Sequence, residues 1–139
     1  MTRQEQLYPD HTFTIMNRSA APYIDYIRNG EKKAEVRVNS KAYQQLQVGD
    51  KVYFHNHREG ILCKVTYLHR YKSFAAMLQQ EGIDNVLPQL KNADLAAHEK
   101  EAKALQIYNN FPGAFRAQQL GVVAIGVEFL ANYFKGKLT

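Results

Sequence analysis

Hydrophobic and polar residues alternate over several short stretches of the chain, which is the pattern of half-buried β-strands. Short bends between some of these stretches, at residues 48–50 and 58–60, favour strands that follow one another directly. The final stretch is almost wholly apolar and contains Gly126, where we expect the sheet to bend tightly. The pattern predicts five strands, over residues 12–16, 34–38, 51–55, 61–71 and 122–129.

A helix is predicted between the first two strands. Pro22 suits the first turn of a helix, and Tyr23, Ile24 and Ile27 would share one face. Gly30 then fits a left-handed cap that ends the helix.

Two more helices are predicted between the fourth and fifth strands. Ser73 is a good N-cap for a short helix over residues 74–81, which Gly82 would close. Asp94 could cap a longer helix that runs through Tyr108.

The predicted order of elements indicates an α+β protein. Strands that are contiguous in sequence and joined by short bends favour a largely antiparallel sheet or barrel over a doubly wound sheet. No internal repeat or linker divides the chain, so we expect a loose lead-in over residues 1–10 and one domain over residues 11–139.

Composition narrows the class of protein only modestly. Among 139 residues there are 18 Lys and Arg against 13 Asp and Glu, a net charge of +5. This charge suits a polyanionic partner such as RNA and equally suits a plain solvated surface. Cys63 is the only cysteine, so no internal disulfide can form, and no apolar run is long enough to span a membrane. We therefore expect a cytoplasmic protein without a membrane partner.

Six short motifs occur in an order that resembles the ASCH domain family. A G-x-K-x-x-E-x-R run is present as Gly30, Lys32, Glu35 and Arg37, and the turn Val48-Gly49-Asp50 follows it. The later motifs are Tyr71-Lys72-Ser73-Phe74, Leu87-Pro88, Tyr108 and the closing strand over residues 121–126.

The resemblance runs from about residue 12 to residue 130 and implies a fold and a partner. The family fold is a small mixed, mostly antiparallel β-barrel similar to the PUA domain, here with about three flanking helices. The implied partner is RNA or a modified nucleoside, held in a basic cleft around Lys32, Glu35 and Arg37.

Lys32 is the first candidate for chemistry at such a cleft. It lies just past a predicted helix end, and desolvation together with Arg37 would lower its pKa, which makes a neutral amine base or nucleophile possible. The alternative is a solvated lysine that the helix dipole favours.

Glu35 and Arg37 lie two residues apart on a predicted strand, so their side chains emerge on one face. Arg37 could bind a phosphate or a base edge, with Glu35 as an acceptor or general base. The alternative is an exposed ion pair worth about 0–1 kcal/mol.

Some ASCH-like proteins are amidohydrolases that remove the acetyl group of N4-acetylcytidine with a lysine, a threonine and a glutamate. By motif position the lysine is Lys32, the threonine position holds Glu35, and the glutamate corresponds to Glu81. The chain thus lacks the expected hydroxyl beside Lys32. We expect either RNA or nucleoside binding without chemistry, or a small hydrolase or ribonuclease in which Lys32 and a carboxylate act as acid and base.

The resemblance also implies that Tyr71, Ser73 and Tyr108 bind the ligand, the rings by stacking on a base and Ser73 by hydrogen bonding. Ser73 is also explained as a helix cap, and the two tyrosines as packed aromatic residues. His55 and His57 have no convincing third ligand nearby, so neither a metal nor another cofactor is predicted.

Overall fold

The computed structural model describes residues 8–138. The expected loose lead-in over residues 1–10 therefore falls mostly on residues 1–7, outside the described part of the chain.

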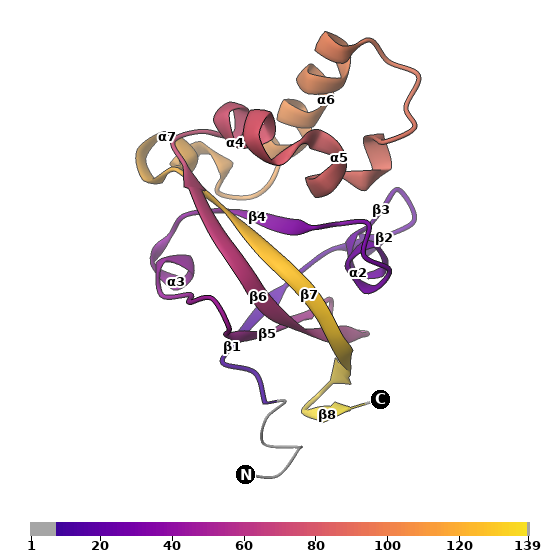
Figure 1. The fold of residues 1–139 in the computed structure, drawn as a ribbon, viewed down its shortest axis with the longest axis vertical. Coiled ribbons are helices and arrows are strands. Elements are labelled where there is room, and N and C mark those ends of the chain that lie inside the picture. The colour runs from indigo at the N-terminus through magenta and orange to yellow at the C-terminus, as the bar shows by residue number, and fades with distance from the viewer. Residues whose placement is uncertain (1–7, 139) are drawn as a thin grey trace.

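One mixed sheet forms the body of the molecule (Figure 1). Its strands follow the order β1-β5-β6-β7-β4, with β8 paired to the end of β7, and the separate strands β2 and β3 pair with each other. Strand β1 is parallel to β5, and the other pairs are antiparallel. The bounds are β1 His11–Thr14, β2 Asn17–Arg18, β3 Ala21–Pro22, β4 Ala34–Val38, β5 Lys51–His55, β6 Gly60–Tyr71, β7 Val122–Phe134 and β8 Lys137–Leu138.

The five predicted strands all form, and the longest two form the centre of the sheet. Strand β7 extends five residues beyond its predicted end, because its second half continues along β6. At Gly126 the register of β6 against β7 shifts, which leaves Thr66 as an extra residue on β6. The tight bend expected at this glycine is therefore a β-bulge.

The prediction of a closed barrel is not confirmed, because β1 and β4 are edge strands that do not pair in the described residues. A side chain spans the open side instead. Arg37 on β4 donates from Nη2 to the carbonyl oxygen of Thr14 at the end of β1, at 2.7 Å. The α+β class is confirmed, with a sheet that remains open where this arginine lies.

The structure has more helices than the three predicted. The six α-helices of the described residues are α2 Tyr23–Arg28, α3 Lys41–Gln44, α4 Phe74–Glu81, α5 Ile83–Val86, α6 Ala97–Asn109 and α7 Ala117–Leu120, and two 3-10 helices are η1 Pro88–Leu90 and η2 Ala114–Arg116. The three unpredicted α-helices have four residues each, which is too short for a helical period to appear in the hydrophobic pattern.

The start of the longest helix corrects one prediction. Asp94 does not cap α6, whose first residue is Ala97 and whose N-cap is Ala96. The Leu95 amide donates to the Ala93 carbonyl, so the chain makes a tight turn at Asp94 before the helix begins. By contrast, Ser73 caps α4 as predicted, with Oγ accepting from the Ala76 amide at 3.1 Å.

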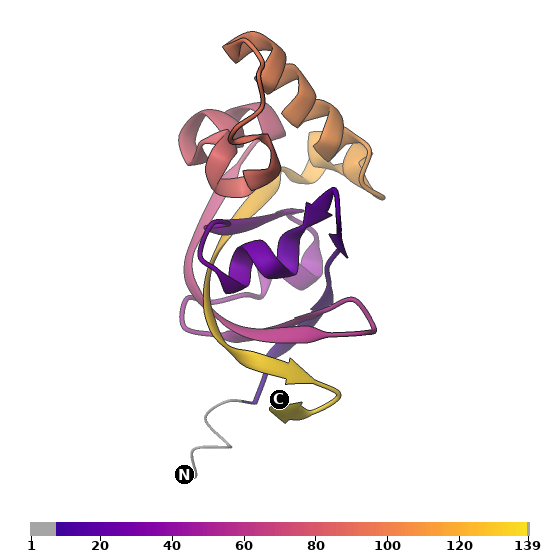
Figure 2. The same cartoon turned by 90° about the vertical axis from the view of Figure 1, so that its right-hand side faces the viewer.

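The core lies between the sheet and the helices. Figure 1 shows α4, α5, α6 and α7 gathered at one end of β6 and β7, and Figure 2 shows α2 crossing in front of the sheet. Ile24, Phe54, Val65 and Ile125 are fully buried in one continuous cluster. In the described residues, no helix combines the length and apolar character needed to cross a membrane.

Candidate functional site

Strand β4 and the turn before it carry the charged residues of the site. Helix α2 ends at Arg28, and Gly30 adopts a positive φ of 82° that reverses the chain. The backbone amide of Lys32 then donates to the Tyr26 carbonyl at 3.0 Å, which holds Lys32 against the end of the helix. Lysine side chains are normally charged and solvent-exposed, but Lys32 is only 2% exposed.

The Lys32 ammonium has three neighbours within the fold. Its Nζ donates to the carbonyl oxygen of Val86 at 2.5 Å and lies 3.2 Å from Glu35 Oε1. It also lies 4.7 Å from the centre of the Tyr23 ring, within the range of a cation–π contact. Lys32 is therefore a buried lysine with specific partners, and the alternative of a solvated lysine is wrong.

Glu35 joins Lys32 to Arg37. Its Oε2 accepts from Arg37 Nε at 3.0 Å and from Nη2 at 2.7 Å. The predicted shared face is confirmed, but the side chain of Glu35 is 9% exposed and that of Arg37 is 21% exposed. This pair is much more buried than the exposed ion pair that was the alternative, so removing one partner leaves a charge in a poorly solvated place.

The electrostatics of the three groups follow from burial and from one another. Burial lowers the pKa of Lys32, and Glu35 only partly opposes this. For Glu35, burial alone would raise the pKa, but Arg37 and Lys32 together outweigh it and lower the pKa. For Arg37, burial acts to lower the pKa and Glu35 outweighs it, so Arg37 stays charged.

These residues line a pocket of about 410 Å³ on the open side of the sheet. The volume falls in the roughly 300–1,000 Å³ range that is typical of small-molecule sites. Its polar rim includes Ser40 and the exposed Arg116, and its apolar wall includes Phe74 and Phe111. The pocket occupies the place where a closed barrel would have paired β1 with β4.

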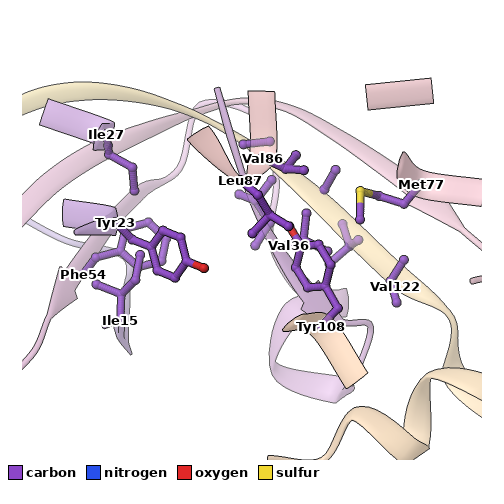
Figure 3. Packing of buried hydrophobic residues seen from close by; sticks show 14 of the residues in the cluster. Ile15, Tyr23, Ile27, Val36, Phe54, Met77, Val86, Leu87, Tyr108 and Val122 are labelled. Atoms are coloured by element: carbon purple, nitrogen blue, oxygen red, sulfur yellow. The ribbon is translucent and has the colours of Figure 1, made fainter. Parts of the chain in front are cut away.

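Tyr108 lines this pocket and has a buried hydroxyl. The residue is 2% exposed, and its hydroxyl has no hydrogen-bond partner in residues 8–138. The ring stacks on Phe74 with centroids 5.0 Å apart, so its position is determined by packing. Burial, then Glu35 and Tyr23, raise the pKa of Tyr108 well above its usual value, so it stays protonated. In Figure 3, the hydroxyl groups of Tyr23 and Tyr108 point into the space between the two rings.

Glu81 does not lie with Lys32. Its carboxylate accepts from the hydroxyls of Tyr67, at 3.2 Å, and Tyr71, and it lies 2.8 Å from His69 Nδ1. The side chain is 6% exposed, yet it does not line the Lys32 pocket. The structure therefore brings Glu81 and Tyr71 together in a separate cluster, and Glu35 is the carboxylate beside Lys32.

Ser73 also lies outside the pocket. Its oxygen caps α4, and the residue lines a second hollow that shares Phe74 and Ala114 with the pocket. Of the four residues predicted to bind a ligand, Arg37 and Tyr108 line the pocket, whereas Tyr71 and Ser73 do not.

Sequence reasoning missed three residues that support the charged cluster. Tyr43 accepts from Arg37 Nη1 at 2.9 Å, Thr14 accepts through its backbone, and Tyr23 lies beside Lys32. Tyr23 was assigned only to the apolar face of a helix. A tyrosine at a core position usually places its hydroxyl on a polar partner, and here Gln89 donates to it at 2.8 Å.

Neither the single cysteine nor any cluster of metal-ligating side chains adds a second candidate site in the described residues. Cys63 is fully buried, and burial raises the pKa of its thiol to about 12, as a small core residue requires. Within residues 8–138, no three His, Cys, Asp or Glu side chains gather in a way that could hold a metal ion.

The mixed sheet with helices packed at one end is the type of α+β fold that the family resemblance implies. The sequence profile described as the ASCH domain matches residues 20–131. The chain belongs to the ASCH domain family.

Two solved structures are similar over most of their length. A crystal structure of hypothetical protein PH0355 has a TM-score of 0.70 and 29% identity, and the match covers 86% of this chain and 98% of that one. The solution NMR structure of protein PF0455 from Pyrococcus furiosus has a TM-score of 0.63 and 27% identity, and covers 86% and 96%. Among curated proteins, none matches the chain.

Proposed function

We propose that this ASCH domain binds RNA by taking one nucleobase, standard or modified, into the pocket around Lys32, Glu35 and Arg37. Two cations and one carboxylate give the cluster a net positive charge, which favours a ligand that carries phosphate. The same groups offer both donors and an acceptor, and a nucleobase edge presents both kinds of partner.

The observation that carries this proposal is the buried Tyr108 hydroxyl. A buried hydroxyl without a partner costs about 1–3 kcal/mol, and a ligand that hydrogen-bonds to it recovers that cost on binding. The pocket is apolar on the side of Phe74 and Phe111 and polar on the side of β4, which matches a flat base with a polar edge.

The replacement Tyr108→Phe tests the proposal because it removes only this hydroxyl. We expect it to weaken binding of nucleosides, measured by NMR titration, by about 3- to 10-fold, the value of one hydrogen bond. Thermal stability should not fall, because the hydroxyl has no partner to lose among the described residues.

Tyr26→Phe is the matched control, since Tyr26 is half-buried and does not line the pocket. It should leave nucleoside affinity unchanged. If no nucleoside shifts the amide signals of β4 and α6 in the unmodified protein, the proposed site is wrong.

Hydrolysis of an acylated nucleoside is the second candidate function. It is favoured by Lys32, whose lowered pKa increases the fraction of neutral amine available as a base. In such a reaction water attacks the acyl carbon and the C–N bond breaks, releasing the free amine and a carboxylic acid. Glu35 is a weak base because two cations lower its pKa, and this makes binding the better-supported function.

Mass spectrometry separates the two functions. The protein is incubated with N4-acetylcytidine and with digested RNA, beside a Lys32→Ala control. Loss of the acetyl group with the unmodified protein only would establish a hydrolase, and unchanged nucleosides with both would leave binding as the function.

A further inference from the structure

A second hollow adjoins the pocket. It has a volume of about 600 Å³ and shares Phe74 and Ala114 with the pocket, so the two are separated by one wall. Its other lining residues include Lys72, Asn109, Phe115 and Gln118. None of these four residues lines the pocket around Lys32.

Phe115 is the most exposed large hydrophobic residue of the described chain. It is 83% exposed and lies in η2, directly before Arg116, which lines the pocket. Phenylalanine is normally buried, and a single exposed ring beside a basic residue provides a face on which a base can stack.

The polar residues of the hollow agree with a nucleic acid. Lys72 is exposed and has no ion-pair partner in residues 8–138, and no carboxylate lines the hollow. Asn109 and Gln118 are exposed amides that can both donate to and accept from a base edge. Cation, amides and aromatic ring together are the groups that bind single-stranded RNA.

We infer that the hollow is a second subsite that takes the nucleotide adjacent to the one in the pocket, so that the ligand is single-stranded RNA rather than a free nucleoside. The inference rests on the proposed function, because it assigns the first nucleotide to the pocket. Phe115 stacks on the second base. Lys72 lines the second hollow and Arg116 lines the pocket, so both lie beside the path of the phosphates that link the two nucleotides.

Two kinds of ligand and three variants test the subsite. The ligands are a mixed-sequence single-stranded RNA of eight nucleotides and the four nucleoside 5′-monophosphates, measured by fluorescence anisotropy and NMR titration. The variants are Phe115→Ala, Lys72→Ala and the control Val48→Ala, which alters an exposed hydrophobic residue outside both hollows.

Phe115→Ala should weaken binding of the RNA by about 5- to 100-fold, the effect of losing one stacked base, and leave the monophosphates unaffected. Lys72→Ala should weaken RNA binding and reduce its dependence on salt. Val48→Ala should change neither. Because Phe115 and Lys72 are exposed, both variants should fold normally.

RNA affinity that is unchanged in Phe115→Ala would overturn the subsite while leaving the pocket proposal intact. A loss of RNA affinity in Phe115→Ala, with no effect of Tyr108→Phe on any ligand, would support the hollow and overturn the pocket. If neither RNA nor monophosphates bind the unmodified protein, both proposals are wrong.

Discussion

Two cationic side chains, Lys32 and Arg37, share the single carboxylate of Glu35 in a place with little access to water. Arg37 also has Tyr43 and Thr14 as partners, and Lys32 has the Val86 carbonyl, but neither set supplies a negative charge. The charge balance of the site therefore depends on Glu35.

The replacement Glu35→Gln should lower the free energy of unfolding by about 3–5 kcal/mol, because it leaves the buried Lys32 and the half-buried Arg37 without a counter-charge. Urea unfolding measures this loss. Glu31→Gln is the matched control on the same segment, since Glu31 is exposed and should cost little. Equal losses in the two variants would contradict the role given to Glu35.

The pH dependence of stability has a defined sign. The pKa of Glu35 is lowered in the folded protein from 4.5, so the unfolded chain binds more protons over the range just below that value. Its contribution is fully present above about pH 4.5 and is lost as the pH falls through the lowered pKa. Glu35→Gln should therefore show a flatter loss of stability in acid than the unmodified protein.

Some of this site was predictable from residues alone. The two-residue spacing of Glu35 and Arg37 predicts a shared face on any strand, and that prediction is confirmed. The pairing of Glu81 with Tyr67 and Tyr71 was not predictable, because it depends on how α4 packs over β6. The number of residues between Lys32 and Glu81 does not indicate that the two side chains lie apart in the fold.

At the scale of elements, the bulge where β6 pairs with β7 depends on one small residue, Gly126. A Cβ atom at Gly126 would lie 2.3 Å from the Tyr67 ring and 2.6 Å from Thr66 Oγ1. The ring cannot easily move, because its hydroxyl donates to Glu81. The sequence predicts a bend at Gly126. The structure shows that glycine is required there because the bulge in β6 brings side chains close to this position.

Gly126→Ala should lower the free energy of unfolding by about 1–3 kcal/mol through overpacking. The loss should be smaller in a Tyr67→Ala background, where the obstructing ring is gone and only the contact with Thr66 Oγ1 remains. Thermal or urea unfolding of the four proteins measures this coupling. A loss that is the same in both backgrounds would mean that the ring is not the cause.

At the scale of the whole molecule, a pocket and one arginine occupy the open side of the sheet. Within residues 8–138, strand β1 pairs with β5 alone, and at its other edge Arg37 donates to the Thr14 carbonyl. A lysine retains the charge, but its single nitrogen with three donors cannot reproduce the four bonds that three separate nitrogens of Arg37 make to Glu35, Tyr43 and Thr14.

Arg37→Lys should therefore loosen β1 without disturbing the central strands. We expect backbone amides of β1 to exchange with solvent about 10- to 100-fold faster, as one lost charge-assisted bond implies, while those of β6 and β7 keep their protection. Hydrogen exchange followed by NMR measures this. Arg70→Lys is the control, because Arg70 is exposed and its hydrogen bond to the Tyr43 carbonyl is long, at 3.5 Å. Unchanged exchange in β1 would show that the arginine does not hold the open side.

Sequence alone determined the five main strands, the longer helices and the family, because these depend on local period, caps and a chain-long order of motifs, whereas the two-residue strands β2, β3 and β8 were not predicted. Only the tertiary structure decided that the sheet stays open, that Glu35 rather than Glu81 partners Lys32, and that the Tyr108 hydroxyl is buried without a partner in residues 8–138. The physical reason is that periodicity records which face of an element is apolar. Edge pairing, register between distant strands and the packing of short helices depend on contacts between residues far apart in the chain, which local pattern does not encode.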